Sequence, residues 1–497
     1  MKSTLTRIVS IAFLLVLFIP HLTSAETKTF IREYTYQAGD EDSKYSSRTI
    51  SLREVKRLLL EELGTYLEST TEVQDFQLTK DQIITLTAGI VQTELVEEKW
   101  DGRTYWMKAK IQADSGDVIK AIDMLRKDRQ KTQELEEVRK KSDDLLKENE
   151  RLRQELATAN GKKKKKVTEA YNRTIRDLKA AEWFEKGFQF VITERWKEAL
   201  DAFTITIDLN PQDAVAHFSR GFAYDSLGNT KQAIKDYDKA IQLNPQIALA
   251  YYSRGNDYSK LGNTKQAIKD YDKAIELNPQ LAVAYYNRGT AYSELDNTKQ
   301  AIEDYDKAIE LNPQDAKAYY NRGNAYSKLG NTKQAIEDYD KAIELNPQDA
   351  NAYVNRGVAY GELGSTKQAI KDYDKAIELN PQLAEAYYSR GVAYRNLGNT
   401  KQAIKDLDKA IELNPQLAEA YYSRGVAYGE LGSTKQAIKD FNKAIELNPQ
   451  DANAYVSRAN AYGELGNTQQ AMKDIKIAAR LGHETAQDYL RERGIVW

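Results

Sequence analysis

The sequence predicts a mainly α-helical protein in which a small α+β domain and a helical connector precede a solenoid of nine helix–turn–helix repeats. Eight of the nine prolines recur every 34 residues, from Pro211 to Pro449. This period is typical of stacked helical pairs, and it places nine repeats over residues 180–485. Within one period, apolar residues recur twice at helical spacing, whereas the N-terminal region contains alternating segments around Asp101-Gly102, which is typical of a β-hairpin.

The composition excludes several classes of function. The 497 residues include no cysteine and three histidines, of which His21 lies in a predicted signal peptide. Without thiols there is no disulfide framework and no Cys-ligated metal, and the two remaining histidines argue against a multi-histidine site. The formal net charge of −2 argues against nucleic acid, which would require a basic footprint. We therefore expect no metal, no cofactor and no nucleic-acid partner.

Residues 1–25 have the layout of a secretory signal peptide. Lys2 and Arg7 precede an apolar run over residues 8–19, Pro20 ends it, and small residues follow at 23–25. The alternative is an uncleaved anchor, but the run is shorter than the ~20 residues that a spanning helix needs. We expect an exported protein, periplasmic or secreted in a bacterium, with no stable membrane span after processing.

Residues 26–117 are expected to form the small α+β domain. Its expected elements are a strand at 29–38, helices at 47–69 and 81–89, and hairpin strands at 90–100 and 103–113. The run Ser47-Arg48-Thr49-Ile50-Ser51-Leu52, Leu63-Gly64 and the closing hairpin together resemble the N-terminal domain of flagellar assembly protein T and related envelope proteins. This resemblance implies a bacterial cell-envelope setting.

Paired acids in this domain raise the alternative of an enzyme. Glu97 and Glu98 are adjacent on a hairpin strand, so they point to opposite faces of the sheet. They cannot act together on one substrate. We therefore expect that the protein is not an enzyme.

Residues 118–160 are predicted to form a helical, coiled-coil-like stalk. Apolar and polar residues fit a and d positions of three heptads at Leu135, Val138, Ser142, Leu145, Asn149, Leu152 and Leu156. Two interpretations remain open: a parallel homodimer through 118–160, or a helix that lies on the protein's own N-terminal domain or first repeat. Residues 161–179 are interpreted as a lysine-rich hinge and lead-in helix. Its run at 162–166 is either solvated or in contact with anionic lipid or envelope polymer.

The repeat at residues 282–315 shows the pattern of each pair. One helix carries Ala284, Tyr285 and Tyr292, and a second carries Ala301 and Tyr305. The array resembles the tetratricopeptide repeat family through residues that the first repeat holds at Trp183, Gly187, Phe190, Ala199, Phe203 and Pro211. The resemblance implies a right-handed superhelix whose concave face, lined by the first helices, binds a peptide or partner protein. In the ninth repeat Ala459 replaces the glycine and His483 the proline, as in a capping repeat, and residues 486–497 would add a capping helix and tail.

Two charged ladders run along the array. The seventh repeat position is arginine at Arg220, Arg254, Arg288, Arg322, Arg356, Arg390, Arg424 and Arg458. Sixteen residues after each stands an aspartate, at Asp236, Asp270, Asp304, Asp338, Asp372, Asp406, Asp440 and Asp474. The arginines either form an anion-binding stripe or pair with these aspartates, and charge pairing favours the second interpretation.

Aromatic and amide side chains are the candidate groove residues. The fifth repeat position carries tyrosine at Tyr252, Tyr286, Tyr320, Tyr388 and Tyr422. The sixth and ninth positions carry asparagine at Asn256, Asn287, Asn321, Asn324, Asn355 and Asn460. Tyrosine suits a binding surface, but packing between repeats is an equal alternative. Chaperone-binding members of the family hold carboxylates with lysine at the fifth position, which is never lysine here, so that clamp is not supported.

The expected function is an exported, non-enzymatic scaffold that binds a partner protein or peptide in the groove, in the assembly of a cell-envelope complex. The alternative is a binder of peptidoglycan or an exported polysaccharide through the tyrosine-rich groove.

Overall fold

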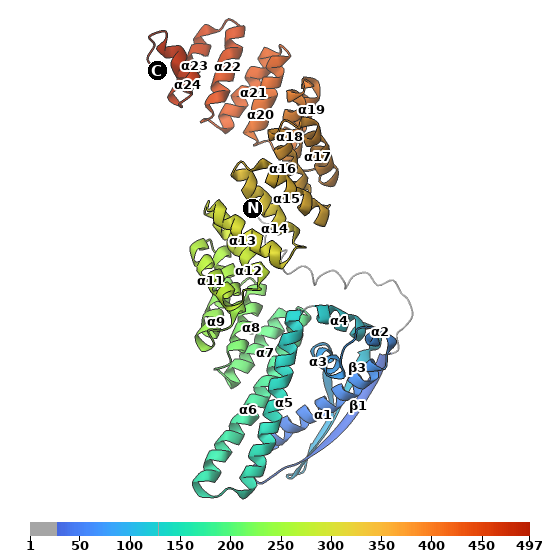
Figure 1. Ribbon diagram of the computed structural model, residues 1–497. Coiled ribbons are helices and arrows are strands. Elements are labelled where there is room, and N and C mark those ends of the chain that lie inside the picture. Colours follow the sequence, from blue (N-terminus) through green and yellow to red (C-terminus); the bar gives the residue numbers. More distant parts are fainter. Residues whose placement is uncertain (1–26, 128) are drawn as a thin grey trace. The chain divides into compact units, whose positions relative to one another are not determined.

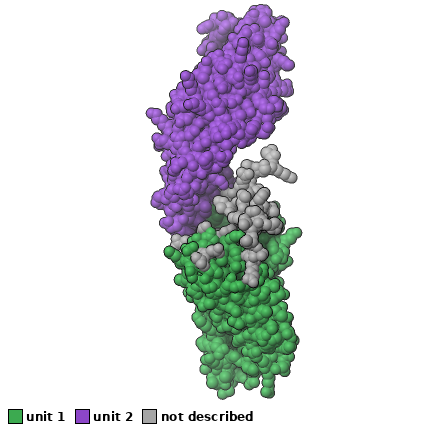
Figure 2. All heavy atoms as spheres, turned by 90° about the vertical axis from the view of Figure 1, so that its right-hand side faces the viewer, with its two compact units in different colours: residues 1–257 green, residues 258–497 purple. Residues whose placement is uncertain are grey.

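The computed structural model describes residues 27–127 and 129–497, which divide between two compact units, residues 1–257 and 258–497 (Figures 1 and 2). The division falls within helix α10 (Ala248–Lys260). The predicted signal peptide, residues 1–25, lies outside the described residues. In the part of the chain that the structure describes, no helix combines the length and apolar character needed to cross a membrane.

An antiparallel sheet forms the centre of the N-terminal domain. Its strands are β1 (Thr27–Gln37), β2 (Thr93–Trp100) and β3 (Thr104–Asp114), in the order β1-β3-β2. Between β2 and β3, Asp101 Oδ1 accepts hydrogen bonds from the backbone N–H groups of Arg103 (2.9 Å) and Thr104 (2.6 Å). The predicted hairpin is confirmed.

Four helices accompany the sheet: α1 (Lys44–Glu68), α2 (Thr71–Gln74), α3 (Lys80–Ile90) and α4 (Ser115–Lys127). Helix α1 begins with a capping box, in which Ser43 and Ser46 satisfy each other's backbone N–H groups. It packs on β1 and β3, and alternate residues of β3 from Tyr105 to Ala113 are buried beneath it. Alternation on β3 thus supplies one apolar face, and this face forms the core with α1.

The connector lies against the N-terminal domain of its own chain. Helices α5 (Arg129–Thr158) and α6 (Gly161–Ile192) run side by side (Figure 1). Leu152 and Leu156 of α5 share one hydrophobic core with Tyr171 of α6 and with the sheet. Ser142, Asn149, Leu152 and Leu156 of the predicted heptads are buried within the chain, whereas the side chains of Leu135 and Val138 lie outside the described part. The packing therefore supports the interpretation in which the connector helix lies on the protein's own N-terminal domain, because these buried side chains are not available to a second chain.

Of the hinge and lead-in helix predicted at residues 161–179, the helix is confirmed and the hinge is wrong, because α6 is continuous over these residues. Residues 162–166 form the first turns of α6, and Lys163 and Lys164 pair with Glu155 (3.2 Å) and Glu41 (2.8 Å). Gly161 adopts φ 57°, which lets α6 start directly after α5. Helix α6 then continues without a break past residue 180, so its C-terminal part serves as the first helix of the first repeat.

The repeats are pairs of helices, as predicted. In the first unit the pairs continue through α7 (Trp196–Leu209), α8 (Ala214–Ser226), α9 (Thr230–Leu243) and part of α10. In the second unit they are α11 (Thr264–Leu277), α12 (Ala282–Glu294), α13 (Thr298–Leu311), α14 (Ala316–Lys328), α15 (Thr332–Leu345), α16 (Ala350–Glu362), α17 (Thr366–Leu379), α18 (Ala384–Asn396), α19 (Thr400–Leu413), α20 (Ala418–Glu430), α21 (Thr434–Leu447), α22 (Ala452–Glu464) and α23 (Thr468–Arg480). The last helix, α24 (Glu484–Arg491), buries Leu490 against the final pair.

Close approach of the two helices explains the glycine at the eighth position of most repeats. A Cβ on Gly289 would lie 2.9 Å from Tyr305 Cε1 and 3.1 Å from the Ala301 carbonyl oxygen. The turn that joins the helices needs a left-handed residue; Glu194 (φ 57°) in the first repeat and Asp296 (φ 61°) take that conformation where the other turns have glycine.

Candidate functional site: the first helices of the repeats

Five of the ladder arginines, Arg288, Arg322, Arg356, Arg390 and Arg424, each donate to two aspartates, whereas Arg458 donates to Asp474 and Asn442. Arg288 donates from Nε and Nη2 to Asp304 (2.8 and 2.6 Å), and from Nη1 to Asp272 of the preceding repeat (2.6 Å). The pairing with the aspartate sixteen residues later also joins Arg220–Asp236, Arg322–Asp338, Arg356–Asp372, Arg390–Asp406, Arg424–Asp440 and Arg458–Asp474. Arg254 of the first unit pairs with Asp238 (2.6 Å), and Asp270 is buried in the second.

The environment of these pairs is that of a structural bridge. Burial alone would lower the pKa of Arg288, but the hydrogen bonds that it donates to Asp304 and Asp272 raise the pKa above its ordinary value. Burial raises the pKa of Asp304 even with Arg288 beside it. The guanidinium also lies over the ring of Tyr285 (5.7 Å). All three nitrogens of Arg288 are engaged inside the array, so this geometry favours pairing over an anion-binding stripe.

The two aspartates on one arginine should differ in their effect on stability. Arg322 donates to Asp338, whose side chain is 7% exposed, and to Asp306, which is 51% exposed. We expect Asp338→Ala to lower the free energy of unfolding by about 3 kcal/mol, because it leaves a buried charge with one exposed partner. Asp306→Ala should cost less than about 1 kcal/mol. Urea unfolding followed by circular dichroism measures both, and equal losses would contradict the bridge.

The fifth-position tyrosines connect neighbouring repeats. The ring centroid of Tyr286 lies 6.0 Å from that of Tyr305, and its hydroxyl accepts a hydrogen bond from Asn321 of the next repeat (3.0 Å). Tyr320 and Asn355 repeat this contact (3.0 Å), and Tyr422 meets Ser457 (3.4 Å). Half-buried Tyr388 packs beside the core of Leu407, and Tyr252 is half-buried on α10. Of the two interpretations of these tyrosines, this geometry favours packing between repeats.

The asparagines form part of the same polar contacts. Asn324 Oδ1 accepts hydrogen bonds from Asn355 Nδ2 and from the hydroxyl of Tyr339, both at 2.8 Å. Asn256 and Asn287 are half-buried on α10 and α12, whereas Asn460 on α22 is exposed. The structure therefore brings Asn321, Asn324 and Asn355 together with the tyrosines along neighbouring first helices of the second unit.

Comparison of the repeats with one another marks a face that motif-based reasoning missed. The second helix hardly varies, and α13 and α15 have identical sequences. The first helix changes from repeat to repeat mainly at the positions that α12 fills with Val283, Tyr286, Asn287, Thr290, Ser293 and Glu294. This spacing places the variable positions on one face of each first helix. The second repeat position is exposed at Val283, Lys317, Asn351, Glu385, Glu419 and Asn453.

Helix-interior glycines on the same face have no packing role of their own. A Cβ built on Gly361, Gly429 or Gly463 would meet no atom within 4 Å. Glycine in a helix costs stability relative to alanine, and it permits close approach of another backbone. These glycines keep the surface of α16, α20 and α22 open.

The paired acids of the N-terminal domain take different partners. Glu98 accepts hydrogen bonds from Arg48 Nε (2.8 Å) and the hydroxyl of Tyr105 (2.9 Å), whereas Glu97 pairs with Lys99 (2.7 Å). The two carboxylates do not form one site.

Family models match most of the repeat array. Models described as tetratricopeptide repeat match residues 214–247, 248–281, 282–315, 316–349, 384–417 and 418–451, and further ones match 338–371, 441–473 and 361–398. Together these matches run without a gap from residue 214 to residue 473. No curated protein matches the chain.

Several solved structures are similar to parts of the chain. YrrB, described as a TPR protein with an unusual peptide-binding site, is 30% identical, covers 38% of this chain and 97% of its own, and has a TM-score of 0.35. MamA is 31% identical, covers 33% and 96%, and has a TM-score of 0.31. A tetratricopeptide repeat protein from Parabacteroides merdae is 21% identical, covers 52% and 99%, and has a TM-score of 0.41.

Proposed function

The chain belongs to the tetratricopeptide repeat family, whose repeats form scaffolds for protein–protein interaction, and we propose that it is an exported, non-enzymatic scaffold that holds a partner protein or peptide along its first helices. In this proposal the partner belongs to a cell-envelope complex. The basic, apolar and small-residue sections of residues 1–25 support export.

The observation that carries the proposal is the confinement of repeat-to-repeat variation to one face of the first helices. The second helices keep nearly the same residues in every repeat, both at buried positions such as Ala301 and Tyr305 and at exposed ones such as Lys299. The first helices instead vary at the exposed second position, for example from Lys317 to Asn351 to Glu385. A surface that changes in charge from one repeat to the next suits an extended partner with a defined sequence.

The tyrosines are less suitable as the specific contacts. The hydroxyls of Tyr286 and Tyr320 already accept hydrogen bonds from asparagines of the next repeat. Alanine at these positions would disturb the packing between repeats as well as the surface. Nothing in this arrangement favours a saccharide over a protein, so polysaccharide binding is not proposed.

The test uses exposed residues, whose replacement leaves the core unchanged. We expect the triple variant Asn351→Ala, Glu385→Ala, Glu419→Ala to capture its envelope partner at least about tenfold less well than the parent, because hot-spot contacts carry most of a binding energy. Capture is measured by crosslinking in intact bacterial envelopes, followed by identification of the partner and titration of the purified pair.

The matched control replaces three exposed lysines at the start of second helices, Lys333, Lys367 and Lys401, with alanine. This control should retain capture, and both variants should retain their helical circular dichroism. Equal capture by the triple variant and the parent would overturn the assignment of the face. Recovery of the protein only from the cytoplasmic fraction would overturn export.

A further inference from the structure

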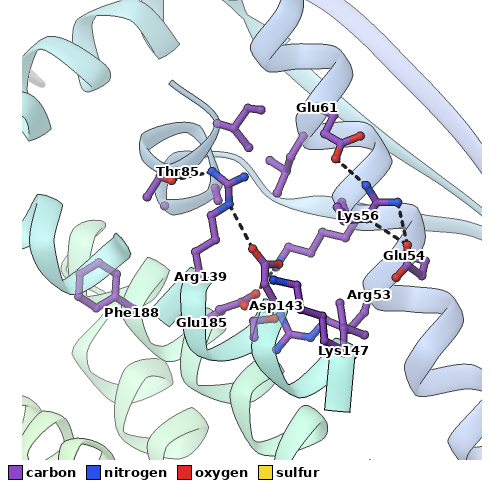
Figure 3. Close-up of a pocket in the computed structure, with 17 residues that line it drawn as sticks. Arg53, Glu54, Lys56, Glu61, Thr85, Arg139, Asp143, Lys147, Glu185 and Phe188 are labelled. Carbon is purple, nitrogen blue, oxygen red and sulfur yellow. Dashed lines mark hydrogen bonds and ion pairs between the residues drawn. The ribbon is translucent and has the colours of Figure 1, made fainter. Parts of the chain in front are cut away.

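A cavity of about 430 Å³ lies in the first unit between α1, α3, α5 and α6 (Figure 3). In the first repeat, Glu185 and Phe188 occupy the sixth and ninth positions of the variable face, and there they line this cavity beneath the N-terminal domain, so the α1–α6 cavity is a site that the proposed scaffold function does not use. Its volume lies within the range of small-molecule sites.

One wall of the cavity is apolar. Leu60, Ile84 and Phe188 line it and are buried, and Ala88 and Leu146 extend it. An apolar group of roughly the size of a branched side chain would remove this wall from water.

A second wall contains Arg53, a buried cation with one unpaired donor. The side chain of Arg53 is 6% exposed, and its Nη1 and Nη2 donate to Glu185 and to the Leu178 carbonyl oxygen (3.3 Å). Its Nε is buried without a hydrogen-bond partner in the structure. Lys56 Nζ shares the same Glu185 (2.6 Å), so two cations face one carboxylate. An anionic acceptor from a ligand would satisfy Nε and balance the charge.

A carboxylate that accepts no hydrogen bond from the described residues lines the same cavity. It belongs to half-buried Asp143, whose nearest cation is Arg139 Nε at 3.9 Å. Arg139 instead donates to Thr85 Oγ1 (2.7 Å), and Arg57 is engaged by Glu54 and Glu61. Burial raises the pKa of Asp143 and outweighs the lowering by the surrounding cations Arg139, Lys147, Arg53 and Arg57. Asp143 points into the space between Arg139 and Glu185 in Figure 3.

We propose that the α1–α6 cavity binds a small zwitterion with an apolar side chain, that is, a free apolar α-amino acid. Its carboxylate accepts from Arg53 Nε, its ammonium donates to Asp143, and its side chain packs on Leu60, Ile84 and Phe188. Such a ligand supplies a hydrogen-bond acceptor for Arg53, a cation for Asp143 and an apolar group for the apolar wall.

The probes are L-leucine, L-leucinamide and N-acetyl-L-leucine, titrated into the full chain by isothermal calorimetry. Leucinamide lacks the carboxylate and N-acetyl-leucine lacks the ammonium, while all three keep the side chain. We expect saturable binding of leucine, and binding at least about tenfold weaker for each of the other two, because each loses a charge-assisted hydrogen bond.

Variants of the chain test the two polar contacts separately. Asp143→Asn should weaken leucine binding at least about tenfold, whereas Asp144→Asn, an exposed neighbour on the same helix, should leave it unchanged. Arg53→Lys keeps a cation beside Glu185 and removes Nε, and it should also weaken binding. Absence of leucine binding, equal binding of all three probes, or unchanged binding by folded Asp143→Asn would each overturn the proposal.

Discussion

Replacing Glu185 with alanine is expected to lower the free energy of unfolding of the first unit by about 3–5 kcal/mol, the cost of breaking a buried ion pair. The side chain of Glu185 is 17% exposed and stands between buried Arg53 (6% exposed) and half-buried Lys56 (15% exposed). It joins α6 to α1, across a sequence separation of more than a hundred residues. Removing it leaves these two cations without their carboxylate.

The contribution of Glu185 should depend on pH. Burial alone would raise the pKa of Glu185, but Arg53 and Lys56 outweigh burial and hold the pKa at about 2, below its ordinary value of 4.5. A carboxyl whose pKa is lowered by folding stabilises the protein above the unfolded pKa. The difference corresponds to about 3 kcal/mol, fully present above pH 4.5 and lost as the pH falls toward 2. Urea unfolding of the parent and of Glu185→Gln should therefore differ most at neutral pH and converge in acid.

Two further variants distinguish the effect of leaving buried charges unpaired from the effect of losing a side chain of α6. Glu169→Ala, at an exposed position of α6, should change the free energy of unfolding by less than about 0.5 kcal/mol. The triple variant Arg53→Met, Lys56→Met, Glu185→Leu should recover most of the loss, since apolar residues of similar volume remove the unpaired charges. A Glu185→Ala protein as stable as Glu169→Ala would refute the buried bridge.

A single methyl group at Gly357 should destabilise the array by about 2–3 kcal/mol, through overpacking between the helices of one repeat. A Cβ at this position would lie 2.6 Å from Tyr373 Cε1 and 3.0 Å from Cδ1. The ring of Tyr373 is buried in the cluster of the same helical pair, so it has no free space into which to move. Gly357→Ala therefore forces α16 and α17 apart.

The same helix contains a matched control. A Cβ at Gly361 meets no atom within 4 Å, so Gly361→Ala should stabilise α16 by up to about 1 kcal/mol through helix propensity. Thermal unfolding followed by circular dichroism should move in opposite directions for the two variants. A stabilised Gly357→Ala protein would show that the helices approach less closely than described. If the partner lies over α16, Gly361→Ala should also weaken its capture.

The local sequence pattern was sufficient to predict the structure where the stabilising contacts are local or recur with the repeat. The proline period gave the repeat boundaries, and the turn residues at Asp101-Gly102 gave the hairpin, because both depend on backbone preferences of neighbouring residues. The pair of Arg288 and Asp304 was visible because both residues recur with the repeat. The second aspartate, such as Asp272 on Arg288, was missed because its contact depends on how one repeat stacks on the preceding repeat.

The sequence by itself determined the helical pairs, the N-terminal α+β domain and the family, since periodicity and turn chemistry repeat along the chain. Only the tertiary structure decided what the connector contacts. A heptad pattern predicts that one face of α5 is covered. The pattern is the same whether a second chain or the N-terminal domain covers that face. The lysine run at 162–166 is mostly exposed, as a solvated run would be, but it lies in α6 because lysine favours helix and Tyr171 and Leu178 anchor that helix in the core. Both outcomes depend on burial against residues that are distant in the sequence. Local sequence patterns do not reveal which distant residues pack together.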